Sequence, residues 1–411
     1  MIKSSDLKKA RELIAGRFIA QCNTGPQGKD LPDTTSSCGQ FLDDTTSTQR
    51  GLHGTAAAIR VLAEDGRLES RALIPKLIRY VQDRHSTEDP VSQSDHPTSV
   101  REQIERDDAN VIKISEVLFA LKFVDGAVFD TGALRTRLAD VLLAGMINPN
   151  GWGYFLDRRN GEPQLLPTAH AVRALAEHGY QVEQPIKYLL GALIMKSSGD
   201  AATRADVSVR VFCLYVLSFI RNAETIDGGD GLPRVFTSIW RQLESLLDND
   251  IEQNIEYSRD REHYYVRVPW QLYLLALAAK LAPKRRFASR AAQARLKSIL
   301  TAVNSPVGFT YPHSGLRVSS RTNAILYDVF SAIEKQLERT YQVLLVPAQA
   351  IDLLRTFLSS RWVRFAAVLG SLVVIILSLY SWYNRGGDIG ELAPELLAGF
   401  LLLLITAGKA R

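Results

Sequence analysis

The feature that most constrains this sequence is an internal repeat of twelve residues. Thr55–Gly66 and Thr168–Gly179 share the pattern T-A-x-A-[IV]-R-x-L-A-E-x-G, at an offset of 113 residues, and a Phe-Leu-Asp tripeptide lies upstream of each copy. We expect Thr168 to cap its helix and the glycine of each copy to end its helix. Self-similarity of this kind indicates a repeat architecture, in which each unit buries its apolar face against its neighbours.

Two kinds of helix alternate along the chain. One kind is apolar nearly all round, which is typical of a buried helix, and the other is amphipathic, which is typical of an outer layer. The buried kind is expected to begin near Gly54, Asn110, Pro167, Asp206, Val268 and Ser319. The amphipathic kind is expected at 1–22, 69–83, 131–146, 184–195, 233–247 and 286–303.

The period-two alternation of a strand is almost absent from the sequence, so the predicted fold class is all-α. Six inner and six outer helices spaced in this way predict an (α/α)6 toroid of helical-hairpin repeats over residues 1–350. An open solenoid is the structural alternative. We favour closure into a ring because the helices are short and the N-terminal helix has no other obvious partner.

The C-terminal residues 351–411 have a different composition. Residues 365–382 carry no charge and approach the length that crosses a bilayer, whereas 392–407 is shorter and contains Pro394 and Glu395. We predict a two-helix transmembrane hairpin, with a buried or interfacial helix as the alternative for the second segment. The residues that mark it are Phe365, Trp382, Leu392, Glu395 and Ala407.

The charges that flank the two apolar segments predict their orientation. Arg355, Arg361 and Arg364 precede the first segment, and Lys409 and Arg411 follow the second. The positive-inside rule then places both ends, and the helical domain, in the cytoplasm of a bacterial-type inner membrane. The formal net charge of +5 suits an anionic ligand or a membrane surface without requiring either.

The cysteines do not predict a metal site. Cys22, Cys38 and Cys213 are far apart and do not form a Cys-x-x-Cys or Cys/His cluster, so we expect reduced thiols, no metal and no cofactor. The first residues form an amphipathic helix without the apolar core of a secretory signal.

Two glycine-aromatic turns, Gly151-Trp152-Gly153-Tyr154 and Gly308-Phe309-Thr310-Tyr311, each lead into an apolar helix that begins with Thr or Ser. Over about residues 39–335 the chain resembles the prenyltransferase and terpenoid-cyclase α/α toroids. The resemblance implies a ring of helices around a central cavity. The Asp-x-Cys zinc motif of the protein prenyltransferases and the DxDD acid of the cyclases are both missing from the sequence. We therefore do not expect an enzyme of this superfamily, although one acting on a prenyl diphosphate or polyprenyl lipid is the alternative.

Arginines and aromatic residues cluster near the predicted inner helices. A buried arginine requires a partner, which is either a carboxylate of a neighbouring repeat or an anionic ligand. Both interpretations remain open, and the ligand would be a nucleotide, an oligonucleotide or a prenyl diphosphate. The candidate ligand-binding residues are His53, Trp152, Tyr154, Asp157, His170, Arg173, Arg210, Tyr264, Arg267, Trp270, Tyr311, His313 and Arg321.

The two parts of the chain together suggest a sensor joined to a membrane effector. In this hypothesis a cytoplasmic toroid binds a ligand or a partner protein and controls a membrane-disrupting or channel-forming hairpin, as in some anti-phage defence proteins. Two helices cannot enclose a pore, so a channel requires a homo-oligomer. Glu391 and Glu395 fit an oligomeric interior because ionisable side chains avoid lipid.

Overall fold

The computed structural model divides the chain into two compact units, Met1–Leu337 and Glu338–Arg411. All the residues that the structure describes belong to the first unit. They are 2–23, 36–43, 51–85, 110–126, 129–156, 161–194, 204–220, 231–247, 253–259, 262–281, 289–310, 317–335 and 337.

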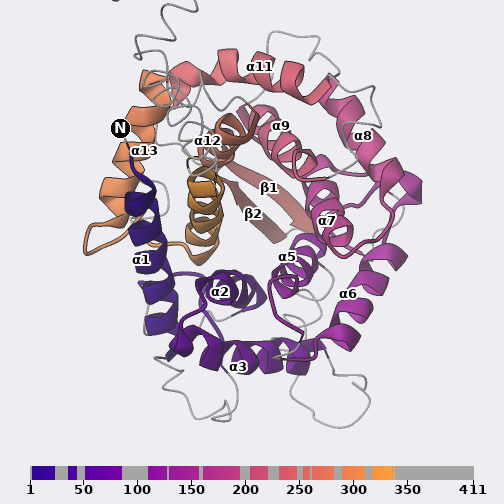
Figure 1. Ribbon diagram of the computed structural model, residues 1–411. Coiled ribbons are helices and arrows are strands. Elements are labelled where there is room, and N and C mark those ends of the chain that lie inside the picture. The colour runs from indigo at the N-terminus through magenta and orange to yellow at the C-terminus, as the bar shows by residue number, and fades with distance from the viewer. Residues whose placement is uncertain are drawn as a thin grey trace, which may run out of the picture. The chain divides into compact units, whose positions relative to one another are not determined.

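Helices of this first unit lie in two layers (Figure 1). The outer layer holds α1 (Ser4–Asn23), α3 (Leu68–His85), α6 (Gly132–Ala144), α8 (Glu183–Ile194), α11 (Gly231–Leu243) and α13 (Arg290–Val303). The inner layer holds α2 (Leu52–Asp65), α5 (Val111–Leu121), α7 (Leu165–Glu177), α9 (Arg204–Leu217), α12 (Trp270–Leu281) and a last helix at 320–335. Short 3-10 turns, η1 (Asn148–Asn150) and η2 (Glu244–Leu246), follow α6 and α11. The all-α class is confirmed, and each inner helix begins within two residues of its predicted start.

Burial separates the two layers as their sequences predict. Every residue from Trp270 to Ala279 of the inner helix α12 is buried. In contrast, the outer helix α6 buries only Leu134, Leu138, Ala139 and Leu142, which lie on one face at the helical spacing. Neighbouring inner helices pack in chain order, α2 on α5, α5 on α7, α7 on α9 and α9 on α12.

The beginning and the end of this unit are in contact. The backbone N–H of Leu42 donates to the carbonyl of Val318 at 2.7 Å, and that of Ser320 donates to the carbonyl of Gln40 at 2.9 Å. Arg11 of α1 forms an ion pair with Glu334 at 2.6 Å, and α1 also packs on α13. The N-terminal helix therefore has a partner in the last elements of the unit.

Thr168 does not cap its helix, contrary to the prediction. α7 begins at Leu165, so Thr168 lies inside its first turn. Its hydroxyl accepts from the backbone N–H of Trp152 at 3.0 Å, and Thr55 accepts from that of Cys38 at 3.2 Å. Both threonines thus fasten the preceding loop to an inner helix, because a buried loop N–H needs an acceptor.

The repeated glycines end their helices as predicted. Gly66 has φ of 70° and Gly179 has φ of 81°, values in the left-handed region that glycine adopts without a steric penalty.

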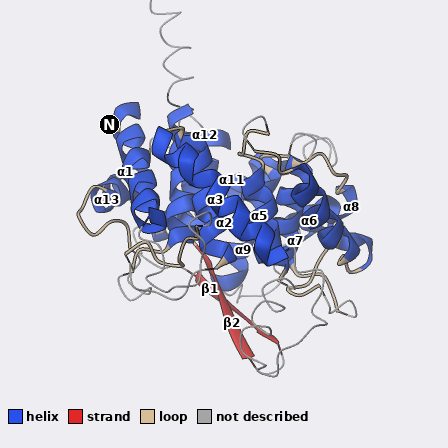
Figure 2. Cartoon of the chain, turned by 90° about the horizontal axis from the view of Figure 1, so that it is seen from below, coloured by secondary structure: helices blue, strands red, loops and turns tan. Residues whose placement is uncertain are grey.

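The sequence prediction was wrong for the segment before α12. Strands β1 (Gln253–Arg259) and β2 (Glu262–Val268) form an antiparallel hairpin with Gln253 opposite Val268, and Figure 2 shows it extending away from the helices. β-branched and aromatic residues recur through both strands, which is the composition that favours a pleated conformation.

Within the described residues, no helix is long and apolar enough to span a bilayer. The predicted membrane segments, with Phe365, Trp382, Leu392, Glu395 and Ala407, lie outside the described residues, so the hairpin stays a prediction.

Candidate functional site

The inner helices surround a narrow cavity. Its volume is about 30 Å³. Side chains from α2, α5, α7, α12 and helix 320–335 line it, so the site is built from segments that are far apart in the sequence. The lining residues are Ala56, Ala57, Arg60, Ser115, Glu116, Phe119, His170, Arg173, Tyr273, Arg321, Ala324 and Ile325.

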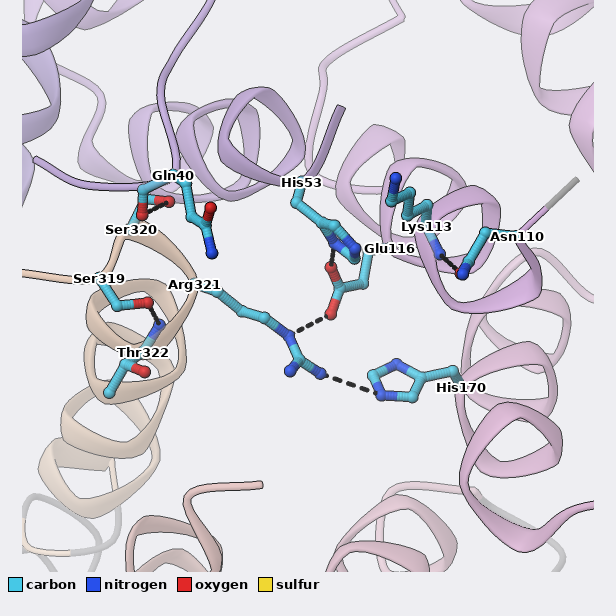
Figure 3. A network of polar contacts seen from close by, with 10 residues as sticks. All are labelled: Gln40, His53, Asn110, Lys113, Glu116, His170, Ser319, Ser320, Arg321 and Thr322. Carbon is cyan, nitrogen blue, oxygen red and sulfur yellow. Dashed lines mark hydrogen bonds and ion pairs between the residues drawn. The ribbon is translucent and has the colours of Figure 1, made fainter. Parts of the chain in front are cut away.

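Two helix caps position the polar end of this cavity (Figure 3). The side chain of Asn110 accepts from the backbone N–H of Lys113 at 3.1 Å and caps α5, which carries Glu116. The hydroxyl of Ser319 accepts from the backbone N–H of Thr322 at 3.3 Å at the start of the helix that carries Arg321. Such caps satisfy the first N–H groups of a helix and fix where it begins.

Glu116 is the centre of a polar network that joins four inner helices (Figure 3). One carboxylate oxygen accepts from Arg321 Nε at 2.6 Å, and the other accepts from His53 Nδ1. Arg321 Nη2 in turn donates to His170 Nε2 at 3.2 Å. Because a guanidinium only donates, His170 accepts through Nε2 and carries its proton on Nδ1.

Burial and charge set the protonation of this network. Burial alone would raise the pKa of Glu116, but the Arg321 guanidinium and His53 outweigh it and hold that pKa well below its usual range. Burial lowers the pKa of His170 well below its usual value and lowers that of His53 as well. Glu116 is therefore ionised and both imidazoles are neutral near pH 7.

The arginines of the two sequence repeats meet at one carboxylate. Arg60 and Arg173 both contact Asp328 Oδ2, and the distance from Arg173 Nη2 is 3.4 Å. The guanidinium carbon of Arg173 lies 3.7 Å from the ring centroid of Phe119, and that of Arg60 lies 5.0 Å from it. The sixth position of the repeat thus brings two cations together around one anion and one aromatic ring.

Aromatic side chains continue the wall beyond His170. The ring of His170 lies 4.5 Å from that of Phe212, and the ring of Tyr273 lies 5.0 Å from Phe212 and 4.7 Å from Tyr215. Burial raises the pKa of Tyr273, so its hydroxyl keeps its proton. This wall is apolar in character and keeps the dielectric constant around the charges low.

Two buried polar atoms at the cavity have no hydrogen-bond partner within the described part of the chain. They are Nε of Arg60 and Oγ of Ser115, and their residues are only 8% and 1% exposed. A buried donor without an acceptor costs about 1–3 kcal/mol, and it is satisfied when a ligand supplies the acceptor.

Four of the predicted residues come together here, namely His53, His170, Arg173 and Arg321. Other candidates have structural roles. Trp152 is fully buried and donates from Nε1 to the carbonyl of Leu142 at 2.6 Å. Arg210 donates to the carbonyl of Leu193 at 2.8 Å, which ties α9 to α8.

Tyr154 and Trp270 are not among the cavity-lining residues. Tyr154 is half-buried against the core, and Trp270 is buried at the start of α12. Tyr264 and Arg267 lie in β2, where only the backbone is described. Asp157, Tyr311 and His313 lie outside the described residues.

The sequence reasoning missed Glu116 and Asp328, the two carboxylates that organise the site. Each is an acidic residue in the middle of a helix predicted to be buried, and a charge buried in this way requires a partner. That signal was present in the sequence and would have identified both residues as partners of the buried arginines.

The described residues contain no group of three His, Cys, Asp or Glu side chains placed to hold a metal ion. No protein-family model, no curated protein and no solved structure matches this chain.

The neutral, buried state of His170 predicts a pH dependence of stability. Its folded-state pKa lies below the unfolded value of about 6.5, so the unfolded chain binds the extra proton and stability falls as the pH drops below 6.5. His170 contributes up to about 1.4 kcal/mol per pH unit to this fall in the free energy of unfolding. Chemical denaturation at pH 7 and pH 5.5 should show a smaller loss for His170→Asn than for the wild type. An unchanged pH slope in this variant would contradict a neutral His170.

Proposed function

We propose that the helical unit is a closed (α/α)6 toroid that binds a small anionic ligand and controls a C-terminal transmembrane hairpin. The ring closure is supported by the contacts of α1 and residues 40–42 with the last elements of the unit. The main support for an anionic ligand is the positive charge of the cavity. Arg60, Arg173 and Arg321 line it, and among the described residues the carboxylates that pair with these arginines are Glu116 and Asp328.

The contacts of the aromatic rings at the cavity favour ligand binding over catalysis on a prenyl group. A prenyl enzyme of the resembled superfamily would need free aromatic faces, since these stabilise a developing carbocation. Here Arg173 already stacks on Phe119 and lies 5.4 Å from the ring centroid of Tyr215. The cations therefore occupy these faces, and the cavity is suited to an anion.

The output of this module is proposed to be a change in membrane permeability. Residues 365–382 have the length and composition of a membrane span, and a pore would require several copies of the two-segment hairpin. We place the toroid and both termini in the cytoplasm of a bacterial-type inner membrane, by the flanking Arg and Lys residues. A role in anti-phage defence is the cellular setting that this layout suggests.

Overproduction of the full chain in bacteria is expected to depolarise the inner membrane, as measured with a potential-sensitive dye. Deletion of residues 361–411 should abolish the effect. Ile375→Arg should also abolish it, because a charge at the centre of the span costs about 2.5–3.5 kcal/mol. Depolarisation that survives the deletion would show that the helical unit, and not the hairpin, is responsible.

A further inference from the structure

The pairing of Arg60, Arg173 and Asp328 leaves the charges of this cluster unbalanced. Two guanidinium groups converge on the single oxygen Oδ2 of Asp328, and Glu116 is engaged by Arg321 and His53. One carboxylate carries one negative charge against two positive charges. Asp328 and both arginines are largely buried, with side chains between 10% and 12% exposed, so water screens this excess only weakly.

Two buried donors lie at the wall of the cavity that Arg60 and Arg173 also line. Arg60 Nε and Ser115 Oγ are buried at the cavity wall without partners among the described residues. A carboxylate has two oxygens, whereas a phosphoryl group has three acceptor oxygens and up to two negative charges. A phosphoryl dianion would balance both arginines and supply acceptors to the free donors.

We infer that Arg60, Arg173 and Ser115 form a phosphoryl-binding site in which Asp328 is a resident anion that the ligand displaces. The inference rests on the proposed function and specifies its ligand and its switch. The phosphoryl group belongs to a small phosphorylated molecule or to a phospholipid headgroup. Its entry separates Asp328 from Arg60 and Arg173.

Displacement of Asp328 would act on the helix at 320–335. This helix is held by Arg321 to Glu116 near its start, by Asp328 to two arginines at its middle, and by Glu334 to Arg11 near its end. It is also the last helix before Glu338–Arg411 in the sequence. Loss of the contacts of Asp328 would therefore couple ligand binding to the C-terminal residues through this helix.

The test is calorimetric titration of the purified full chain in detergent micelles with inorganic pyrophosphate, compared with acetate. Asp328→Asn should bind pyrophosphate about tenfold more tightly than the wild type or better, since the competing charge is gone. Arg173→Gln should bind at least about tenfold more weakly, because one of two cations is lost. The matched control is Arg135→Gln, which removes a guanidinium bonded to the carbonyls of Leu121 and Val124 and should bind like the wild type.

Equal or weaker binding by Asp328→Asn would overturn the inference, as would acetate binding as tightly as pyrophosphate. If Asp328→Asn does not fold, hydrogen exchange of the wild type decides. Pyrophosphate should speed exchange of amides 326–335, and slower or unchanged exchange would contradict displacement. Micelles doped with phosphatidic acid distinguish the two sources of the phosphoryl group. If the site binds a phospholipid headgroup, phosphatidic acid should compete with pyrophosphate and weaken its binding. If the site binds only soluble molecules, phosphatidic acid should leave pyrophosphate binding unchanged. Pyrophosphate that binds as predicted without altering membrane depolarisation would reject the proposed function and leave the site intact.

Discussion

Replacement of Trp152 with alanine is expected to lower the free energy of unfolding by about 3–5 kcal/mol. The indole is fully buried, and its Nε1 donates to the carbonyl of Leu142 at 2.6 Å. Alanine would leave a cavity in the core and remove the indole donor from the Leu142 carbonyl, which would keep the Gly145 N–H. Urea denaturation of the full chain in detergent, followed by circular dichroism at 222 nm, measures the loss.

Two further substitutions make this test specific. Trp152→Phe keeps most of the ring volume and should cost clearly less than alanine. Leu68→Ala, at a side chain 84% exposed, should change stability by no more than about 0.5 kcal/mol. If Trp152→Ala kept wild-type stability and lost only pyrophosphate binding, Trp152 would be a ligand contact, as the sequence suggested, and its assignment to the core would be wrong.

Replacement of Glu116 with alanine is the second large effect, with an expected loss of about 3–5 kcal/mol. The substitution leaves Arg321 without its carboxylate and takes the acceptor from His53. A buried cation that loses a carboxylate partner is expensive, whereas the loss of a half-exposed pair is not. Glu177→Ala, which breaks a half-exposed pair with Lys122, is the matched control and should cost about 1 kcal/mol or less.

The same variant should change the acid limb of the stability curve. The folded-state pKa of Glu116 lies well below the unfolded value of 4.5, so its contribution is present above pH 4.5 and is lost as the pH falls toward the folded pKa. Glu116→Ala should therefore lose less stability than the wild type between pH 5 and pH 3. An equal loss in both proteins would mean that Glu116 does not stay ionised in the folded chain.

The fold class was predictable from the sequence because helical periodicity and the repeat agreed. The helix-ending glycines and the starts of the inner helices followed from local rules. The role of Thr55 and Thr168 did not, since both bond to loops that precede their helices by more than ten residues. The β1–β2 hairpin was missed because its alternation is short.

The candidate site was predictable only in part. Arg60 and Arg173 were marked by their equivalent places in the repeat, and His170 and Arg321 by their position on inner helices. Their partners Glu116 and Asp328 lie 205 residues from Arg321 and 155 residues from Arg173, respectively. Such pairings depend on how the inner helices are brought together, and helical periodicity alone does not specify them.

The central claim is that the cationic cavity controls the membrane segment. Its most direct test is inner-membrane depolarisation by the full chain with Arg173→Gln, beside Arg135→Gln as the control for loss of a partly buried arginine. Denaturation of both purified variants should first show a cooperative unfolding transition, which establishes that they are folded. We predict that the wild type and Arg135→Gln depolarise the membrane and that Arg173→Gln does not. Depolarisation by folded Arg173→Gln at the wild-type level would contradict the account.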